Sequence, residues 1–377
     1  MLSVDGATAL LVERGLIDPA WIIDGALTIK SAARRNRNLR VEGAKGAGFL
    51  IKQPDNPGDG DFHLLQREAA FHRFCLEETA ARPISTIVPR LVWSDNPETL
   101  LVFELIAEAT SLWSRLEAGV EERLTVDASR ALGRTLGTFH RLLCLNDWKD
   151  DTRLARLSRG LPWVLRVHQP VPSMLASVSR ANLGLMRILQ TEEGLGKHLD
   201  RLAERWRPSS VIHGDVRLDN VLIRTQRAET EDGPVELWIV DWEAVGFGDP
   251  AWDVAGAFQD FLVYWIFSMP LSDELTAEQM IAQARVPLGG LRTALRALWS
   301  GYKAGACLDG SEADDMLLRA VAFSAARLIQ SAYEISSGSD SLVGPPVVLL
   351  QIAANLLAEP ERGQIELYGI PLGCPIP

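Results

Sequence analysis

The pattern of apolar residues changes once along the chain, near residue 106, and this change constrains the fold more than any other feature. Before it, short runs of β-branched and aliphatic residues alternate with polar or glycine-rich segments, which is typical of strands joined by turns. After it, apolar residues recur at helical spacing, as at Leu132, Leu136, Phe139 and Leu143. The sequence therefore predicts an α+β fold, with a small strand-rich lobe followed by a larger, mainly helical lobe.

The strand-rich part is predicted to contain one inserted helix. This helix is expected at 64–78, where "LLQREAAFHRFCLEE" is rich in good helix formers. The predicted strands are at 26–31, 38–43, 48–53, 90–94 and 99–106, and a hinge is expected near 104–110. We accordingly expect three parts, which are an N-terminal helical extension at 1–25, a small lobe with an antiparallel sheet at 26–108 and a helical lobe at 109–377.

Composition excludes several classes of protein. The formal net charge of −11 argues against a general nucleic-acid binder, which usually carries a basic surface. The four cysteines are far apart and form no Cys-x-x-Cys pair, which argues against a disulfide scaffold or a structural zinc site. The chain starts without a basic segment, and the apolar stretch "FLVYWIFSMP" is shorter than a bilayer-spanning helix of about 20 residues. We therefore expect a cytoplasmic protein that binds neither nucleic acid nor membranes.

Ionisable side chains are concentrated in one short segment, residues 211–224, with the sequence "VIHGDVRLDNVLIR". Asp215 follows the aliphatic Val-Ile pair and a glycine, and Asn220 opens a strand-like run. Asp241 stands 21 residues after Asn220, in "IVDWE" within 238–243, where the next strand-like run ends. Two hairpin-like strands would bring these three oxygen-bearing side chains together, and hard oxygen ligands of this kind suit Mg²⁺.

These segments resemble the aminoglycoside phosphotransferase and choline kinase branch of the protein-kinase-like superfamily. The resemblance lies in "HGDVRLDN", "IVDWE", "GFGDPAWDVA" and the upstream "LGTFHRL", and the order of elements agrees from about residue 26 to residue 260. That branch commonly has His-Gly-Asp where protein kinases have His-Arg-Asp, and it has a metal-binding Asp that Phe-Gly need not follow. The resemblance implies a two-lobe kinase-like fold, with ATP and Mg²⁺ as cofactors and the site in the cleft between the lobes.

The resemblance also implies a role for each matching residue. Asp215 would orient the acceptor hydroxyl and take its proton, and Asn220 and Asp241 would hold Mg²⁺. Lys52 would bind the α- and β-phosphates, and Glu68 would pair with Lys52. In the hinge at 103–106, Glu104 and Ile106 would contact adenine. His213 would brace the loop, and Asp253 would anchor it through backbone amides.

Two features leave alternatives open. Arg217 would either contact the γ-phosphate or pair structurally with Asp219 or another carboxylate. The turn "SAARRNRN" has no glycine, although kinases usually cover the phosphates with a glycine-rich turn at this point. Arg34, Arg35 and Arg37 could contact the nucleotide instead, since arginine suits phosphate. The turn could otherwise be a solvated basic turn or a site for an acidic partner segment.

We therefore expect a phosphotransferase that moves the γ-phosphate of ATP directly to a hydroxyl, without a phosphoenzyme. The resemblance favours an aminoglycoside-like, amino-alcohol or sugar acceptor, bound by helical segments within 150–205 and 260–340. One alternative is a Ser/Thr kinase for a peptide, as in lanthipeptide-type or thioamitide-type biosynthesis, acting with a partner lyase. Another is a pseudokinase that binds a peptide or nucleotide without catalysis. The missing glycines favour the pseudokinase slightly, and the retention of Lys52, Asp215, Asn220 and Asp241 argues against it.

Overall fold

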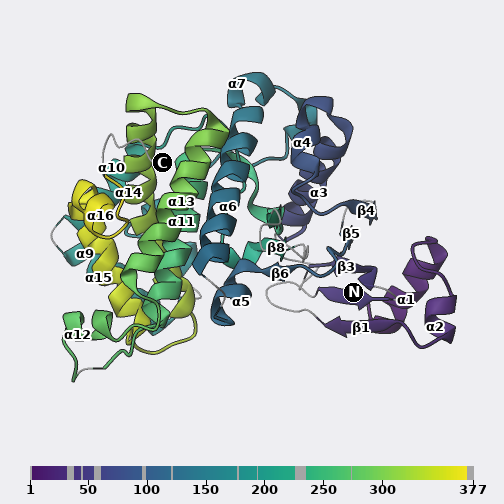
Figure 1. Cartoon of the computed structure of the whole chain (residues 1–377), viewed down its shortest axis with the longest axis horizontal. Coiled ribbons are helices and arrows are strands. Elements are labelled where there is room, and N and C mark those ends of the chain that lie inside the picture. Colours follow the sequence, from purple (N-terminus) through teal and green to yellow (C-terminus); the bar gives the residue numbers. More distant parts are fainter. Residues whose placement is uncertain are drawn as a thin grey trace. The chain divides into compact units, whose positions relative to one another are not determined.

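The structure is a computed structural model that describes residues 2–31, 38–43, 46–54, 61–95, 99–119, 122–175, 178–192, 194–225, 235–272 and 274–371. The chain forms two compact units, whose elements are labelled in Figure 1. The first unit comprises Met1–Ser111, Trp148–Ser158 and Leu222–Val245, and the second comprises Leu112–Asp147, Arg159–Val221 and Gly246–Pro377. The three-part division expected from the sequence stays a prediction.

The first unit contains a five-stranded antiparallel sheet in the order β1-β2-β3-β5-β4. Burial alternates along β2, where Leu39 and Val41 are buried and Arg40 between them is exposed, as expected for a strand with one buried face. The strands are β1 (Thr28–Ser31), β2 (Leu39–Glu42), β3 (Gly48–Lys52), β4 (Leu91–Ser94) and β5 (Leu101–Glu104). All five predicted strands are therefore present, each slightly shorter than predicted.

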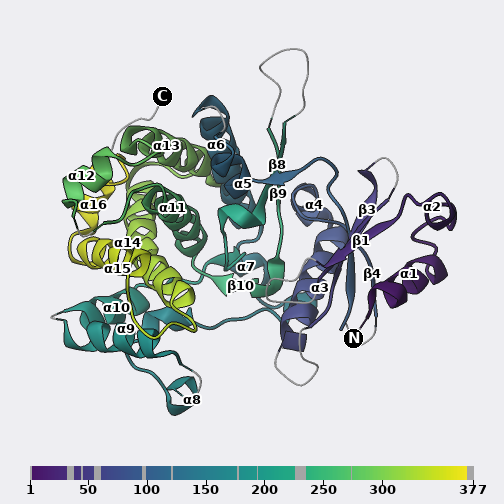
Figure 2. The ribbon, with the colours of Figure 1, turned by 90° about the horizontal axis from the view of Figure 1, so that it is seen from below.

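Helices pack on both faces of this sheet. The helices α1 (Val4–Glu13) and α2 (Ala20–Ile23) lie on one side and α3 (Asp61–Glu77) on the other (Figure 2). Val102 of β5 belongs to the apolar cluster that includes Ala7 and Leu11 of α1. Its neighbours Leu101 and Phe103 belong to a second cluster, with Leu65 and Ala69 of α3. Because neighbouring strand residues face opposite sides, β5 contributes to two separate cores. The predicted helix at 64–78 corresponds to α3.

A second sheet of the first unit has the strand order β6-β8-β9. Its strands are β6 (Thr110–Ser111), β8 (Val221–Thr225) and β9 (Val235–Ile239), and the short helix η6 (Trp242–Ala244) follows. β8 and β9 are consecutive in the chain, and the connection between them is too short for the crossover that parallel strands need. They therefore form an antiparallel hairpin. The other short helices of this unit are η2 (Thr79–Ala81), α4 (Arg82–Ser85) and η3 (Thr152–Leu154).

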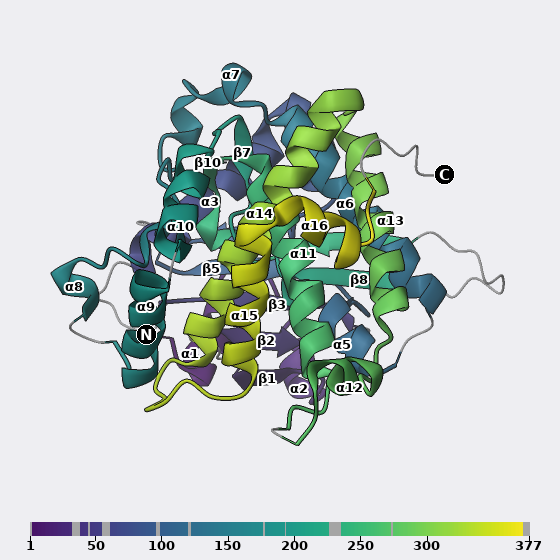
Figure 3. The same cartoon turned by 90° about the vertical axis from the view of Figure 1, so that its left-hand side faces the viewer.

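The second unit is mainly helical, as predicted. Its longer helices include α11, α14 and α15, which lie side by side in Figure 3. The helices are α5 (Leu112–Glu117), α6 (Glu122–Leu142), α7 (Leu145–Trp148), η4 (Trp163–Arg166), α8 (Pro172–Leu175), α9 (Arg180–Thr191), α10 (Leu195–Glu204), η5 (Leu218–Asn220), α11 (Pro250–Phe267), α12 (Ala277–Ala282), α13 (Leu288–Ala306), α14 (Gly310–Ile335), α15 (Pro345–Ala358) and α16 (Pro360–Glu366).

Two short strands of this unit were not predicted. β7 (Ser210–Ile212) and β10 (Gly246–Gly248) pair antiparallel. Three residues are too few to display an alternating pattern, and two glycines in β10 hide its character further. This pair matters for function because β7 leads directly into the loop that begins at His213.

Within the apolar stretch "FLVYWIFSMP", residues 261–267 form the end of α11, which is a central helix of the second unit. Phe261, Leu262 and Ile266 of this stretch are at most 1% exposed, because α11 is covered by its neighbouring helices. In the part of the chain that the structure describes, none of the helices combines the length and apolar character needed to cross a membrane.

Candidate active site

A buried ion-pair cluster lies in the first unit, around Lys52. Lys52 is the last residue of β3, and it is only 4% exposed. Its Nζ donates to both carboxylate oxygens of Glu68 in α3, at 2.8 and 3.0 Å, and to Oδ1 of Asp241 at 2.7 Å. Glu68 also accepts a hydrogen bond from the backbone N–H of Trp242, at 3.2 Å. Lys52 and Glu68 thus form the expected ion pair, and Asp241 forms a second ion pair with the same lysine.

The charges of this cluster compensate for its burial. Burial lowers the pKa of Lys52, but the two neighbouring carboxylates outweigh burial and hold that pKa above its ordinary value. Burial raises the pKa of Glu68, and the ion pair with Lys52 opposes that rise. Removing one partner of such a pair is strongly destabilising, because the other charge stays buried without compensation. The ammonium group is therefore held charged at one position.

Asp241 has an unusual backbone conformation. It adopts the left-handed region, with φ of 68° and ψ of 59°, which few residues other than glycine occupy. Its side chain is 39% exposed, although Lys52 beside it is buried. Trp242 holds the turn by stacking on Phe71, with ring centroids 4.5 Å apart, and by donating from Nε1 to Ile239 O at 2.7 Å. The turn therefore presents a carboxylate at the surface while its neighbours stay packed, a combination that often marks functional sites.

A second group of functional side chains, the second constellation, lies in the second unit, where α11 contacts the loop that follows β7. Asp253 accepts hydrogen bonds from the backbone N–H groups of His213 and Gly214, at 2.7 and 2.9 Å. Asp260 accepts one from the backbone N–H of Leu218, at 2.7 Å. Gly256 lies between these two acids, and an added Cβ there would lie 2.6 Å from Val216 O.

These three helical residues are spaced i, i+3 and i+7, so they occupy one face of α11. Two carboxylates accept from the backbone of the loop, and the glycine between them allows the loop to approach the helix closely. The backbone contacts expected of Asp253 are present, and Asp260 adds a third such contact further along the loop.

Buried hydrogen bonds keep Asp253 ionised. His140 of α6 donates from Nε2 to Asp253 Oδ2 at 3.1 Å, because an ionised carboxylate only accepts, and its Nδ1 lies 3.0 Å from Tyr302 Oη. Burial alone would raise the pKa of Asp253, but His140 and the His213 backbone outweigh burial and hold it below its usual value. His213 is fully buried, and its Nδ1 accepts the backbone N–H of Asp215 at 3.2 Å. Both histidines thus support the loop.

Asp215 lies near the start of this loop and Asn220 lies at its end. The side chain of Asp215 is 32% exposed, and Nδ2 of Asn220 donates to the carbonyl oxygen of Asp215 at 3.1 Å. Arg327 of α14 donates to Oδ1 of Asp215 at 2.8 Å. Arg217 pairs with Glu334, also in α14, at 3.0 Å. Of the two readings left open for Arg217, the contact present is the ion pair with a carboxylate.

The structure describes only some of the residues that are expected to contact the nucleotide base and phosphates. Arg34, Arg35 and Arg37 lie outside the described residues. Glu104 ends β5 and pairs with Arg90 at 2.8 Å, and both side chains are exposed. The backbone N–H of Glu104 donates to Arg90 O within the sheet, and Ile106 is half-buried just after β5. The role of this hinge toward adenine stays a prediction.

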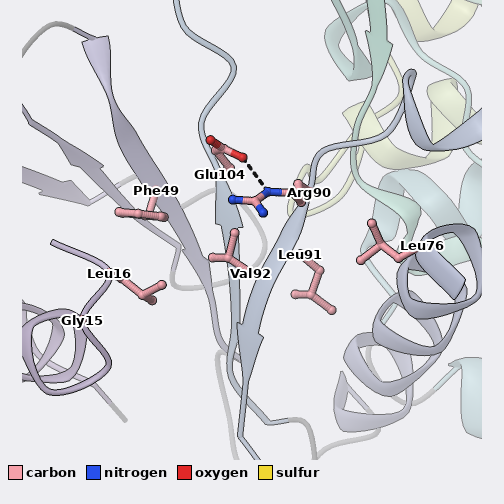
Figure 4. Close-up of a pocket in the computed structure, with 8 residues that line it drawn as sticks. All are labelled: Gly15, Leu16, Phe49, Leu76, Arg90, Leu91, Val92 and Glu104. Carbon is pink, nitrogen blue, oxygen red and sulfur yellow. Dashed lines mark hydrogen bonds and ion pairs between the residues drawn. The ribbon is translucent and has the colours of Figure 1, made fainter.

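Glu104 also lines a shallow pocket of about 430 Å³ in the first unit (Figure 4). Neither Lys52 nor Asp241 belongs to its lining, so this pocket is separate from the ion-pair cluster. The lining residues are Gly15, Leu16, Phe49, Leu76, Arg90, Leu91, Val92 and Glu104.

Mg²⁺ prefers oxygen ligands, and the described residues offer a few of them. Among the described residues, no group of three or more His, Cys, Asp and Glu side chains could hold a metal by itself. Asp241 offers a partly exposed carboxylate, and Asn220 offers an amide oxygen. Mg²⁺ is usually held by one or two carboxylates together with waters and substrate phosphates. Each of these oxygens, taken by itself, is therefore of the kind that Mg²⁺ accepts.

Three helical residues that lie against the loop were not identified from the sequence: Gly256, Asp260 and Arg327. A signal for Asp260 was available, since "AWDVAGAFQDFLVYW" places two acids seven residues apart in an otherwise apolar helix. Arg327 stands alone among small and apolar residues in "AFSAARLIQSA", which is a signal for a buried cation. Neither signal names the partner of the charge.

Comparisons with known proteins agree with this fold. The model of the phosphotransferase enzyme family matches residues 28–298, which is more than half of the chain. The structure of choline kinase from Cryptosporidium parvum Iowa II has a TM-score of 0.54 and 13% identity, covering 98% of each chain. At this identity the likeness shows the fold alone, and it confirms the kinase-like fold predicted from the motifs.

Other solved structures are similar at lower TM-scores. Choline kinase LicA from Streptococcus pneumoniae has a TM-score of 0.48 and 15% identity, covering 92% of this chain and 99% of its own. An aminoglycoside-3'-phosphotransferase of type VIII has a TM-score of 0.47 and 20% identity, covering 84% and 96%. No curated protein matches the chain.

Proposed function

Because the chain belongs to the phosphotransferase enzyme family, we propose that it transfers the γ-phosphate of ATP to a hydroxyl group of a small molecule, with Mg²⁺ bound. The observation that carries the proposal is the ion-pair cluster in which the ammonium of Lys52 lies between the carboxylates of Glu68 and Asp241. Burying an ammonium group costs free energy even where carboxylates compensate for its charge, and binding the phosphates of a nucleotide is the role that the family offers for it.

On the nucleotide side, Lys52 would bind phosphate oxygens while Glu68 keeps the ammonium in position. Asp241 would hold Mg²⁺, together with Asn220. When bound, Mg²⁺ supplies neutralisation of the phosphate charge, which is the main requirement of a loose phosphoryl-transfer transition state.

On the acceptor side, Asp215 would receive the proton of the attacking hydroxyl. Its carboxylate is partly exposed, whereas the backbone on both sides of it is fixed by Asp253 and Asp260. A rigid backbone with an accessible carboxylate suits a positioned base, since much of the rate enhancement in phosphoryl transfer comes from alignment. Transfer would occur in one step from ATP to the acceptor.

The path of the chain supports a joint role for the two constellations. β8 begins directly after Asn220, and its hairpin partner β9 ends two residues before Asp241. The same hairpin therefore carries the end of the loop and the start of the Asp241 turn. We infer that both constellations act on one nucleotide.

The acceptor is proposed from the similar structures. These are named as choline kinases, an aminoglycoside phosphotransferase and a macrolide 2'-phosphotransferase, which supports a small amino-alcohol or sugar hydroxyl. They give no support to the hypothesis of a peptide kinase with a partner lyase. The ion pairs of Lys52 and Asp215 argue against the pseudokinase hypothesis. A cytoplasmic location remains an expectation from composition.

The test is a transfer assay with purified protein, ATP, MgCl₂ and a panel of choline, gentamicin, streptomycin and a macrolide. We expect acceptor-dependent release of ADP and one product that carries an added phosphoryl group by mass spectrometry. The same reactions with GTP will show the preferred nucleotide. A protein that neither releases ADP nor gains thermal stability from ATP with MgCl₂ would contradict the proposal.

Matched variants sharpen this assay. Asp215→Asn should reduce transfer by about 10²- to 10⁴-fold, as is usual when a positioned base is removed. Asp340→Asn, at an exposed position, is its control and should leave transfer unchanged. Lys52→Met should weaken the thermal shift caused by ATP, whereas Lys30→Met, on the exposed strand β1, should not. Equal effects of test and control variants would refute the assigned roles.

A further inference from the structure

Three side chains of α14 form a series of hydrogen bonds that begins at Asp215. Arg327, Gln330 and Glu334 are spaced i, i+3 and i+7, so they share one face of the helix. Arg327 donates from Nη2 to Asp215 Oδ1 at 2.8 Å and from Nη1 to Gln330 Oε1 at 3.1 Å. Gln330 in turn donates from Nε2 to Glu334 Oε1, at 2.9 Å. Nη2 of Arg327 therefore links the helix to the loop, and Nη1 links Arg327 to the next polar side chain of the same helix.

The chain of contacts closes on the loop itself. Glu334 accepts from Nη1 of Arg217, at 3.0 Å, and Arg217 stands two residues after Asp215. The circuit thus runs from Asp215 through three α14 side chains to Arg217, with two acids and two arginines in alternation. Opposite charges follow one another around the circuit, so every charge has a neighbour that stabilises it.

The position of Arg327 is fixed independently of this circuit. Its side chain is 3% exposed, and its guanidinium carbon lies 5.3 Å from the ring centroid of Trp252. Trp252 donates from Nε1 to Gly214 O at 3.0 Å, so the same tryptophan also supports the loop. A guanidinium that packs on an aromatic ring and forms directed hydrogen bonds has little freedom. Arg327 therefore offers Asp215 a rigid partner.

We propose that Arg327 is a positioning residue for Asp215, which holds Oδ1 of the carboxylate so that Oδ2 is available to the acceptor hydroxyl. This inference rests on the proposed function. In the reaction, the acceptor proton passes to Asp215 Oδ2 as the acceptor oxygen bonds to the γ-phosphorus. The bond between that phosphorus and the oxygen of the leaving ADP breaks, and Asp215 later loses the proton to solvent. Arg327 touches neither nucleotide nor acceptor and acts through Asp215.

The test combines Arg327→Gln and Arg327→Lys with Asp215→Asn. The probe reaction is transfer from ATP to water, together with transfer to any acceptor found in the panel. Arg327→Gln should reduce kcat by about 10- to 100-fold while leaving KM for ATP unchanged, since the arginine acts only on the base. Arg327→Lys should recover part of the loss, because it keeps the charge but not the planar fork. In the Asp215→Asn background, Arg327→Gln should cause no further loss.

A matched control is available on the same helix. Arg319 of α14 is also mostly buried and pairs with Asp249, away from Asp215. Any loss of activity caused by Arg319→Gln should therefore have the same factor in the wild-type protein and in the Asp215→Asn variant. If Arg327→Gln behaved in this way too, or if it raised KM for ATP without changing kcat, its role would be structural and the proposal would be overturned.

A second measurement needs no catalysis, so it separates this inference from the proposed function. In urea unfolding, Arg327→Gln and Asp215→Asn should together lower the midpoint by less than the sum of their separate effects, because each removes the same pair. A wild-type protein that transfers no phosphate would contradict the proposed function, yet this coupling would still report on the pair. Should Arg327→Gln fail to fold, Arg327→Lys enters the same cycle. Additive midpoints would overturn the assignment.

Discussion

Replacing Asp260 with asparagine should change how the stability of the protein depends on pH. Asp260 lies on the buried face of α11 and is only 3% exposed. Burial raises the pKa of Asp260 from 3.8 to about 6, although Arg217, the Leu218 amide and Arg327 favour the ionised form. The carboxylate that accepts from the loop therefore carries a penalty for its charge, and asparagine can keep the hydrogen bond to Leu218 without that charge.

The magnitude follows from the difference between the folded and the unfolded pKa. Each pH unit of difference corresponds to about 1.4 kcal/mol, so the rise to about 6 amounts to about 3 kcal/mol. Between about pH 4 and pH 6 the folded state binds the proton and the unfolded state has lost it, so the free energy of unfolding falls as pH rises. Below this window both states are protonated and the penalty is absent. Above it, the penalty is fully present.

The assay is urea unfolding of the wild type and Asp260→Asn at half-unit intervals from pH 4 to about pH 8. Other carboxylates titrate in both proteins, so the difference between the two curves isolates Asp260. We expect the variant to gain up to about 3 kcal/mol relative to the wild type as pH rises through the window. The exposed Asp340→Asn variant should show no such change. The reasoning would be refuted if the two curves were parallel, or if the free energy of unfolding of the variant fell relative to that of the wild type as pH rises.

Three further predictions concern the two constellations. Lys52→Met should lower the free energy of unfolding by about 3–5 kcal/mol in urea titrations, because two carboxylates lose their cation. Gly256→Ala should lower both stability, by about 1–3 kcal/mol, and transfer activity, since its Cβ would lie 2.6 Å from Val216 O and displace the loop. Glu334→Gln should change stability by less than about 1 kcal/mol, since its pair with Arg217 is partly exposed. Because Glu334 lies within 260–340, where we expect the acceptor to bind, the variant should alter KM for the acceptor more than KM for ATP. The reverse result would argue against that expectation.

The kinds of secondary structure were predictable because they depend on local spacing. Alternating burial in β2 and the apolar face of α6 both follow from side chains a few residues apart, so the sequence contains the whole signal. The strands β7 and β10 were missed because three residues carry too little pattern. The pair of Lys52 and Glu68 was also predictable, but through resemblance to a family and not through spacing.

The sequence by itself determined the α+β organisation and the motifs around Asp215 and Asp241. Only the tertiary structure decided which charges serve these motifs. Arg327 lies 112 residues beyond Asp215, and Asp260 lies 42 residues beyond Leu218, whose amide it accepts. Such pairs depend on how α11 and α14 pack around the loop, and many distant side chains contribute to that packing. Local periodicity can show that a charge lies on a buried face, but the partner is chosen by the packing of whole helices.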